Sequence, residues 1–212
     1  MSLLRIDSSI QGAASASSAL ADLVLAEYQA ARPRDTVVRR HIGADPIPSE
    51  AWATAVSAAY VPAEDRSPEQ SAALELATTI AAELQSADVA ILALPLYNFG
   101  VSQHVKTWID LAIAGATPGT RLLDGTPTVL VTTRGGAYGP GTPREGWDHS
   151  TDYLRRILVD VWGAELVVIE REFTLAGVNP ALDDFIELGT LLKKQAEEAA
   201  VAAGHDLARA AA

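Results

Sequence analysis

The sequence contains no cysteine among its 212 residues. Disulfide scaffolds, thiolate zinc sites and cysteine nucleophiles are therefore excluded. Basic residues are also scarce, since 16 lysines and arginines stand against 27 aspartates and glutamates, and the net charge is -11. This balance argues against binding to nucleic acid, which needs a basic surface to displace counterions. It also argues against docking on an anionic membrane surface.

Long apolar runs are absent as well. The opening residues, MSLLRIDSSI, hold only a short apolar run that Arg5 and Asp7 interrupt, so we expect no secretory signal. No stretch approaches the roughly 20 apolar residues of a membrane span. These features lead us to expect a soluble, cytoplasmic protein.

Several motifs of nucleotide and hydrolytic enzymes are missing. The sequence has no G-x-x-x-x-G-K-S/T, no G-x-G-x-x-G and no G-x-S-x-G, which argues against a P-loop enzyme, a Rossmann dehydrogenase and a serine hydrolase. The four histidines and the carboxylates match no zinc spacing, so we expect no metal site.

What the sequence does contain is an alternation of strand-like and helix-like segments. Apolar, strand-like runs cover residues 2–7, 36–42, 88–94, 127–133 and 165–170, and helical spacing covers 15–31, 68–86, 102–115, 148–162 and 180–203. This alternation predicts an α/β fold with a five-stranded parallel sheet between two layers of helices. Right-handed crossovers leave few strand orders, and we expect 2-1-3-4-5. We expect one domain over residues 1–212.

Two segments are less regular. Residues 43–66 carry three prolines together with Trp52 and Tyr60. They form either a surface excursion or a functional element, such as a cap over a site or a dimer contact, and the sequence leaves these alternatives open. After Gly204 we expect a frayed tail.

Three loops follow strands that neighbour one another in the predicted sheet, at the edge where ligands bind in such folds. Residues 8–18 are rich in serine and run into a helix start, where free amides and the helix dipole suit a phosphate. The alternative is that Ser15 or Ser17 only caps the helix. Residues 95–100 place two aromatic residues and an asparagine where a flat ligand would lie, unless they form a packed turn.

The third loop, residues 132–139, contains the pair Gly135-Gly136, which lets the backbone approach a ligand closely. The alternative is a flexible turn with a surface arginine. Each loop is a weak signal alone, but three at neighbouring strand ends indicate a binding site.

These loops carry a family resemblance. Pro95-Leu96-Tyr97-Asn98-Phe99-Gly100, Thr133-Arg134-Gly135-Gly136 and the serine loop before them resemble the FMN-dependent NADH-azoreductases, also described as NAD(P)H:quinone reductases of flavodoxin-like fold. The resemblance covers about residues 2–200. It implies a three-layer flavodoxin-like fold and a homodimer that binds FMN. It also implies that two electrons pass from NADH or NADPH to quinones and azo compounds in a ping-pong cycle.

The resemblance assigns binding roles to residues of all three loops. It implies that the FMN phosphate is held by Ser9, Ser15, Ala16 and Ser17, that the ring and ribityl chain lie along Leu96, Tyr97, Asn98 and Phe99, and that the other ring edge is closed by Thr133, Arg134, Gly135 and Gly136. No side chain is assigned as a catalytic acid or base, because solvent supplies protons. The family's flavin-covering aromatic has no counterpart in residues 116–125, which leaves the acceptor and the nicotinamide preference open.

Two other classes of function remain. One is a flavodoxin-like electron carrier, which binds FMN but passes single electrons to a protein partner without oxidising a nicotinamide. The other is a redox-sensing interaction protein that has lost the flavin.

Overall fold

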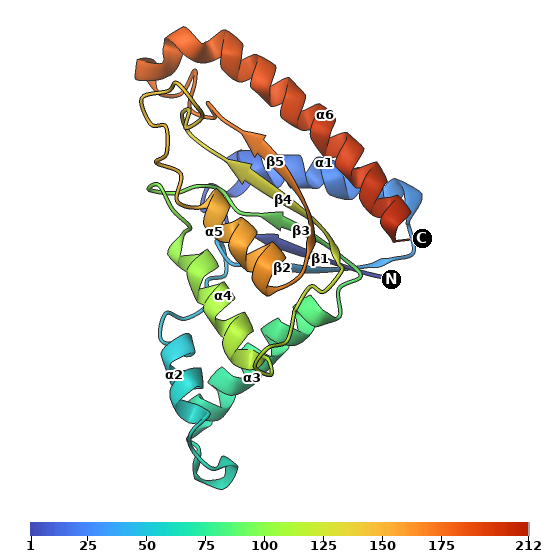
Figure 1. Cartoon of the computed structure of the whole chain (residues 1–212), viewed down its shortest axis with the longest axis vertical. Helices are drawn as coiled ribbons and strands as arrows, with labels where there is room; N and C mark the ends of the chain where they lie inside the picture. Colours follow the sequence, from blue (N-terminus) through green and yellow to red (C-terminus); the bar gives the residue numbers. More distant parts are fainter. Residues whose placement is uncertain (212) are drawn as a thin grey trace.

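A computed structural model describes residues 1–211, and its sheet has five parallel strands in the order β2-β1-β3-β4-β5 (Figure 1). The strands are β1 (Ser2–Asp7), β2 (Thr36–His41), β3 (Val89–Ala93), β4 (Pro127–Thr133) and β5 (Glu165–Arg171). The predicted α/β class, the five strands and their order are thereby confirmed. All residues of the central strand β3 are buried, while the edge strand β2 is partly exposed. This difference explains why β3 is almost purely apolar and β2 is not.

Helices cover both faces of the sheet (Figure 1). One face is covered by α1 (Ala16–Ala31) and α6 (Ile186–Ala210), and the other by α3 (Pro68–Gln85), α4 (Gln103–Gly115) and α5 (Thr151–Arg155), which continues as a π-helical stretch over Arg156–Val161. Short 3-10 helices precede α1, α3 and α6, at Gly12–Ala14, Ala63–Asp65 and Pro180–Phe185. Each face buries its own apolar cluster, and the strand ends remain free to build a site.

Two predicted helix starts have the expected caps. At α3, the Gln70 amide donates to Ser67 Oγ over 3.2 Å and the Ser67 amide donates to Gln70 Oε1 over 3.0 Å, with Pro68 as the first helical residue. This reciprocal arrangement is the predicted capping box. At α4, the Val105 amide donates to Ser102 Oγ over 3.3 Å.

The irregular segment 43–66 contains a helix that the sequence analysis missed. Helix α2 (Ala51–Ala58) packs on α3 and α4 and buries Ala51, Ala55 and Ala58, which share one helical face. The surrounding prolines and the small buried residues hide this pattern, because alanine gives a weak amphipathic signal. Trp52 and Tyr60 remain exposed on the outer side.

The expectation of a frayed tail after Gly204 is wrong. Helix α6 continues to Ala210, and Leu207 and Ala208 are buried in the cluster shared with α1. Gly204 is the point where the two helices touch, since a Cβ there would lie 2.5 Å from the carbonyl oxygen of Val24. The glycine therefore permits close helix packing and does not end the helix. Within residues 1–211, no helix is both long and apolar enough to cross a membrane.

Candidate functional site

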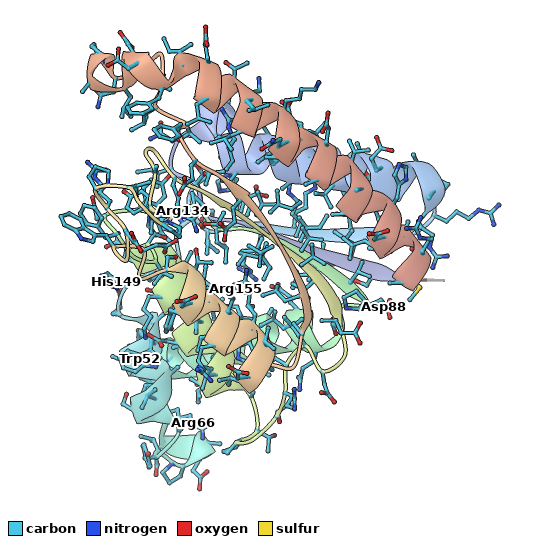
Figure 2. All side chains as sticks on the ribbon, turned by 45° about the horizontal axis from the view of Figure 1, so that its top comes forward. Trp52, Arg66, Asp88, Arg134, His149 and Arg155 are labelled. Carbon is cyan, nitrogen blue, oxygen red and sulfur yellow. The ribbon has the colours of Figure 1, made fainter. Side chains whose placement is uncertain are left out.

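The carboxyl ends of the strands surround a cavity of about 320 Å³. Figure 2 places Arg134 and His149 toward this end of the molecule and Asp88 at the opposite end. Seven of the predicted residues line the cavity, namely Ser9, Ala16, Ser17, Leu96, Tyr97, Thr133 and Gly135. Of the other five, Ser15, Asn98, Arg134 and Gly136 are next to a lining residue in the sequence, and Phe99 lies two residues after Tyr97. The structure thus brings the three predicted loops together around one space.

The serine loop caps helix α1 and also presents hydrogen-bond donors to the cavity. The Ser18 amide donates to Ser15 Oγ over 3.1 Å, so Ser15 caps α1 as the alternative interpretation required. Ser17 Oγ lies 3.2 Å from Ser15 Oγ. The amides of Ala16 and Ser17 have no acceptor within the helix, because they belong to its first turn. These amides and hydroxyls border the cavity and suit an anion.

A second cavity of about 270 Å³ adjoins the first beside the start of α1, and Ala14, Ala16 and Thr174 line both. It is also lined by Arg171, at the end of β5, and by Lys193 and Glu197 of α6, which form an ion pair 3.7 Å apart. The Nε atom of Arg171 is buried and has no hydrogen-bond partner within residues 1–211. Burial lowers the pKa of the Arg171 guanidinium, an effect that Glu197 opposes. No sequence motif points to these cations, because they come from separate elements.

The aromatic loop contains a tight turn. The Tyr97 amide donates to the Gly100 carbonyl over 3.1 Å, and the Gly100 amide donates back over 2.9 Å. The two central residues, Asn98 and Phe99, have φ angles of 46° and 69°. Asparagine tolerates this left-handed conformation, but for a bulky phenylalanine it is strained. Such strain is typical of functional positions, and here it holds the Phe99 ring outward, 38% exposed.

Hydrogen bonds join the three loops to one another. The hydroxyl of Tyr97 accepts from the Ile10 amide over 3.2 Å and lies 3.3 Å from Ser9 Oγ. The Leu96 amide donates to the Thr133 carbonyl over 3.0 Å. The cavity walls are therefore fixed relative to each other by contacts within the chain.

The Arg134 side chain is engaged in an ion-pair network. Its Nε donates to Asp148 over 2.8 Å, its Nη1 donates to Glu170 over 2.9 Å, and its Nη2 donates to Thr151 Oγ1 over 3.0 Å. Only 6% of Arg134 is exposed. We therefore interpret Arg134 as a residue that positions the glycine pair, with its guanidinium directed to the residues before and within α5 and at the end of β5.

Asp148 accepts more hydrogen bonds than the other carboxylates of this network. Burial alone would raise the pKa of Asp148. Hydrogen bonds from the amide and hydroxyl of Thr151 and from the Ser150 amide, together with the Arg134 charge, outweigh burial and hold this pKa below its ordinary value. The carboxylate therefore stays ionised and keeps Arg134 paired.

Part of the site comes from a loop that the sequence analysis did not single out. Thr174, Leu175 and Val178 follow β5 and line the cavity. The Leu175 amide donates to the Gly135 carbonyl over 3.2 Å, and a Cβ on Gly135 would lie 2.7 Å from Leu175 Cδ1. The rule that ligands bind at the carboxyl ends of strands, applied to the fifth strand as well, would have found this loop.

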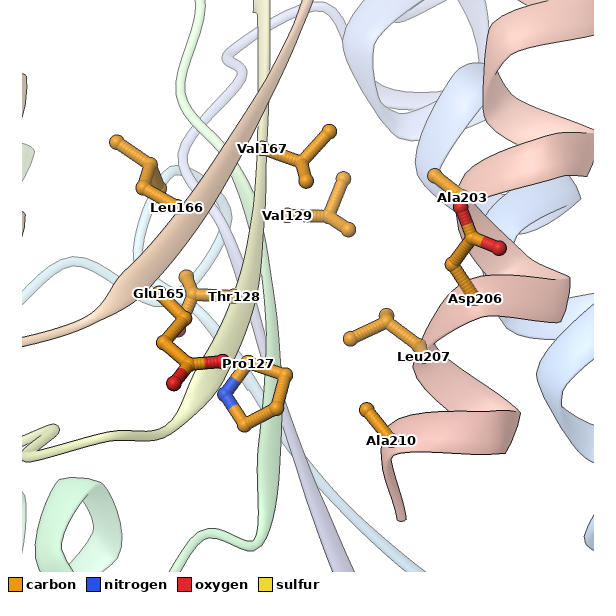
Figure 3. A pocket seen from close by; sticks show the side chains of 10 residues that line it. All are labelled: Pro127, Thr128, Val129, Glu165, Leu166, Val167, Ala203, Asp206, Leu207 and Ala210. Carbon is orange, nitrogen blue, oxygen red and sulfur yellow. The ribbon is translucent and has the colours of Figure 1, made fainter. Parts of the chain in front are cut away.

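A cavity of similar size, about 330 Å³, lies at the opposite end of the sheet (Figure 3). It is lined by the first residues of β4 and β5 and by the last turns of α6, including Val167, Leu207 and Asp206. Ligands of open parallel sheets bind at the carboxyl ends of the strands, and this cavity lies at the amino ends. We therefore assign the functional site to the cavity at the loops.

Comparison with known proteins agrees with the fold. A family described as flavodoxin-like fold matches residues 1–185. A relative from Frankia casuarinae, named FMN-dependent NADH:quinone oxidoreductase, is 38% identical over 203 residues, covering 93% of this chain and 96% of its own. A relative of the same name from Streptomyces avermitilis is 36% identical over 210 residues, covering 97% and 96%.

Solved structures show the same architecture. An azoreductase from Bacillus anthracis has a TM-score of 0.76 at 20% identity, covering 97% of this chain and 99% of its own. An FMN-dependent NADH-azoreductase from the same species, in complex with FMN, has a TM-score of 0.73 at 20% identity, covering 94% and 97%. At this identity the likeness establishes the shared fold.

Proposed function

The chain belongs to the family of flavodoxin-like fold, and from that premise we propose that it is an FMN-dependent oxidoreductase that transfers electrons from NADH to quinones. The main observation behind the proposal is that three loops, joined to one another by hydrogen bonds, surround one cavity at the start of α1. Relatives that match nearly the whole chain and are named FMN-dependent NADH:quinone oxidoreductases support it. We propose azo compounds as a second class of acceptor.

The residues present fit FMN. The amides of Ala16 and Ser17 and the serine hydroxyls would hold its phosphate, and Arg171 would lend positive charge from the adjoining cavity, where Lys193 is paired with Glu197. The flat ring would lie between the loop that contains Leu96 and Tyr97 and the loop that contains Gly135. Bound FMN supplies the chemistry of accepting a hydride from NADH and releasing two electrons to an acceptor.

The protein's own contribution is binding and electrostatics. Within residues 1–211, the cavity lining offers hydroxyls and backbone groups but no carboxylate or imidazole. Backbone amides along the glycine loop would stabilise negative charge on the adjacent ring edge, and solvent would supply protons. We propose that NADH and the acceptor use the same opening in turn, which gives a ping-pong cycle. The cytoplasmic location expected from the sequence stays a prediction.

An absorption spectrum tests this proposal directly. The protein is loaded with FMN, desalted and mixed with NADH or NADPH without oxygen. We expect the flavin to stay bound, to bleach with NADH and to regain its colour when a quinone is added. Bound flavin that neither nicotinamide bleaches would favour the electron carrier. A colourless protein after desalting would contradict the site assignment and favour the non-enzymatic alternative.

The serine loop offers a test of phosphate binding. Replacing Ser15 and Ser17 together by alanine should weaken FMN binding about tenfold, or ~1.4 kcal/mol. Riboflavin binding should change much less, because riboflavin has no phosphate. Isothermal titration with both flavins measures the difference.

A matched variant separates phosphate binding from helix capping. Ser15→Asp keeps a good cap for α1, since aspartate and serine are comparable at this position. Its added charge should repel the phosphate, so FMN binding should fall while the melting temperature and riboflavin binding stay near wild type. Equal losses for both flavins in the double alanine variant, with unchanged FMN binding in Ser15→Asp, would show that the serines only stabilise the helix.

We propose a homodimer, supported by an apolar surface next to the cavity. Large apolar side chains are exposed there, namely Leu175, Val178, Phe185, Ile186, Leu188 and Leu191. An exposed patch of this kind marks a protein contact. Light scattering should give a dimer for the wild type and a monomer for Leu191→Asp. A dimer that Trp52→Asp breaks instead would move the interface to segment 43–66, and a monomeric wild type would remove the proposal.

A further inference from the structure

An aromatic cluster stands beside the cavity, built from the tight turn and from segment 138–147. The Phe99 ring packs edge-on against Trp147, with centroids 5.4 Å apart, and against Tyr138, with centroids 6.2 Å apart. The His149 amide donates to the Phe99 carbonyl over 2.9 Å and fastens the end of the segment to the turn. Trp147 is 51% exposed. The cluster therefore presents open aromatic surface on a fixed base.

Arg144 lies on this cluster as an uncompensated cation. Its guanidinium carbon is 5.9 Å from the Phe99 ring centroid and 5.8 Å from that of Tyr138, and its Nη1 donates to the Tyr138 hydroxyl over 3.3 Å. Within residues 1–211, no carboxylate lies within 4.0 Å of the guanidinium.

The nearby acids are used elsewhere. Glu145 accepts from the Gly141 amide, Glu172 accepts from the Tyr138 amide, and Asp148 pairs with Arg134. Within the described residues, Arg144 therefore takes part in no close ion pair, in a protein whose net charge is -11.

The cluster borders both loops that flank the cavity. Arg144 Nη1 lies 3.6 Å from where a Cβ on Gly136 would be, and the preceding Gly135 lines the cavity. Phe99 follows two residues after Tyr97, which lines the cavity from the other loop. The cluster therefore lies next to both loops that flank the cavity.

We propose that Arg144, Phe99 and Trp147 form an acceptor subsite that selects planar aromatic acceptors carrying a carboxylate or sulfonate. The rings provide apolar contact for a planar acceptor. The guanidinium provides both a stacking plane and a bidentate partner for an oxyanion. Since the net charge of the protein is -11, a cation beside the cavity influences which acceptors approach. The inference rests on the proposed function and names the substrate class of that site.

Two acceptors that differ only in charge test the subsite. Arg144→Met should raise KM for a naphthoquinone sulfonate about fivefold to tenfold, where tenfold equals ~1.4 kcal/mol. The kcat/KM for the neutral naphthoquinone should change less than twofold. Arg144→Lys should restore part of the loss. Arg156→Met removes an exposed cation of the π-helical stretch after α5 and serves as the control, with no expected effect. Equal losses for both acceptors would overturn the proposal.

A binding measurement without turnover keeps this test independent of the proposed function. Naphthalene sulfonate should quench tryptophan fluorescence of the flavin-free protein, and Trp147→Phe should remove most of that quenching. Arg144→Met should raise the dissociation constant about fivefold, an effect that added salt reduces. If the protein fails to oxidise NADH but this pattern holds, the proposed function fails and the anion subsite stands. Unchanged binding of naphthalene sulfonate in Arg144→Met would contradict the proposed subsite, whatever the activity of the protein.

Discussion

Replacing Arg134 by methionine is expected to lower the free energy of unfolding by about 3–5 kcal/mol, the usual range for breaking a buried ion pair. Methionine keeps most of the side-chain length but leaves Asp148 and Glu170 without their cationic partner. Asp148 is held at 2.8 Å from Arg134 Nε, and both side chains are largely buried. Because this network fastens the loop that carries Gly135, we also expect the variant to lose FMN on desalting.

Urea denaturation and the flavin absorbance after gel filtration measure the two effects. Arg121→Met is the matched control, since Arg121 and Asp124 form an ion pair 3.1 Å apart that is largely exposed. Breaking an exposed pair should cost below about 1 kcal/mol. If Arg134→Met and Arg121→Met are equally mild, Arg134 does not position the loop.

The same network predicts how the stability of the folded protein depends on pH. The pKa of Asp148 lies below its ordinary value of about 3.9, so its ionised form is preferred in the folded state. A carboxylate of this kind stabilises the protein fully above the ordinary pKa, and the stabilisation disappears as the pH falls through the lowered pKa. The difference in stability between wild type and Asp148→Asn should therefore be constant near neutral pH and shrink below about pH 4.

Gly43→Ala is expected to disturb the site without touching a ligand. A Cβ on Gly43 would lie 2.4 Å from the Ser9 carbonyl oxygen and 2.6 Å from that of Ser8. Both neighbours are backbone atoms, so the serine loop itself must move. Overpacking of this kind costs about 1–3 kcal/mol of stability. Because Ser9 lines the cavity, FMN affinity should fall at least about tenfold, or ~1.4 kcal/mol.

Thermal unfolding and FMN titration measure this prediction. Gly139→Ala is the control, because a Cβ there meets no atom within 4 Å. The control should bind FMN as the wild type does. Unchanged FMN affinity in Gly43→Ala would mean that the serine loop adapts, and that its position does not limit binding.

The strands and caps were predictable because their signals are local. The apolar run of β3 and the Ser67 capping box lie within single segments, and both have the expected structure. The role of Gly43 was not predictable, since its contact with Ser9 joins two loops that only the folded sheet brings together.

The same limit applies to Arg134 and to the end of α6. The sequence places Arg134 in a loop at the predicted site. It does not show that the side chain of Arg134 contacts Asp148 and Glu170, which come from two other segments. Gly204 looks like a helix stop, and only the close approach of α1 explains why the helix passes through it.

The hydrogen bonds between the loops have a consequence for cooperativity. Ser9, Tyr97, Thr133 and Gly135 belong to distant parts of the chain, yet each is tied to a neighbouring loop or to the segment after β5. Local opening of one loop therefore breaks contacts of the next, and we expect the loops around the cavity to exchange their amide hydrogens as a single unit. A ligand that touches only one loop should then slow hydrogen exchange in all of them, because the hydrogen bonds between the loops couple their opening.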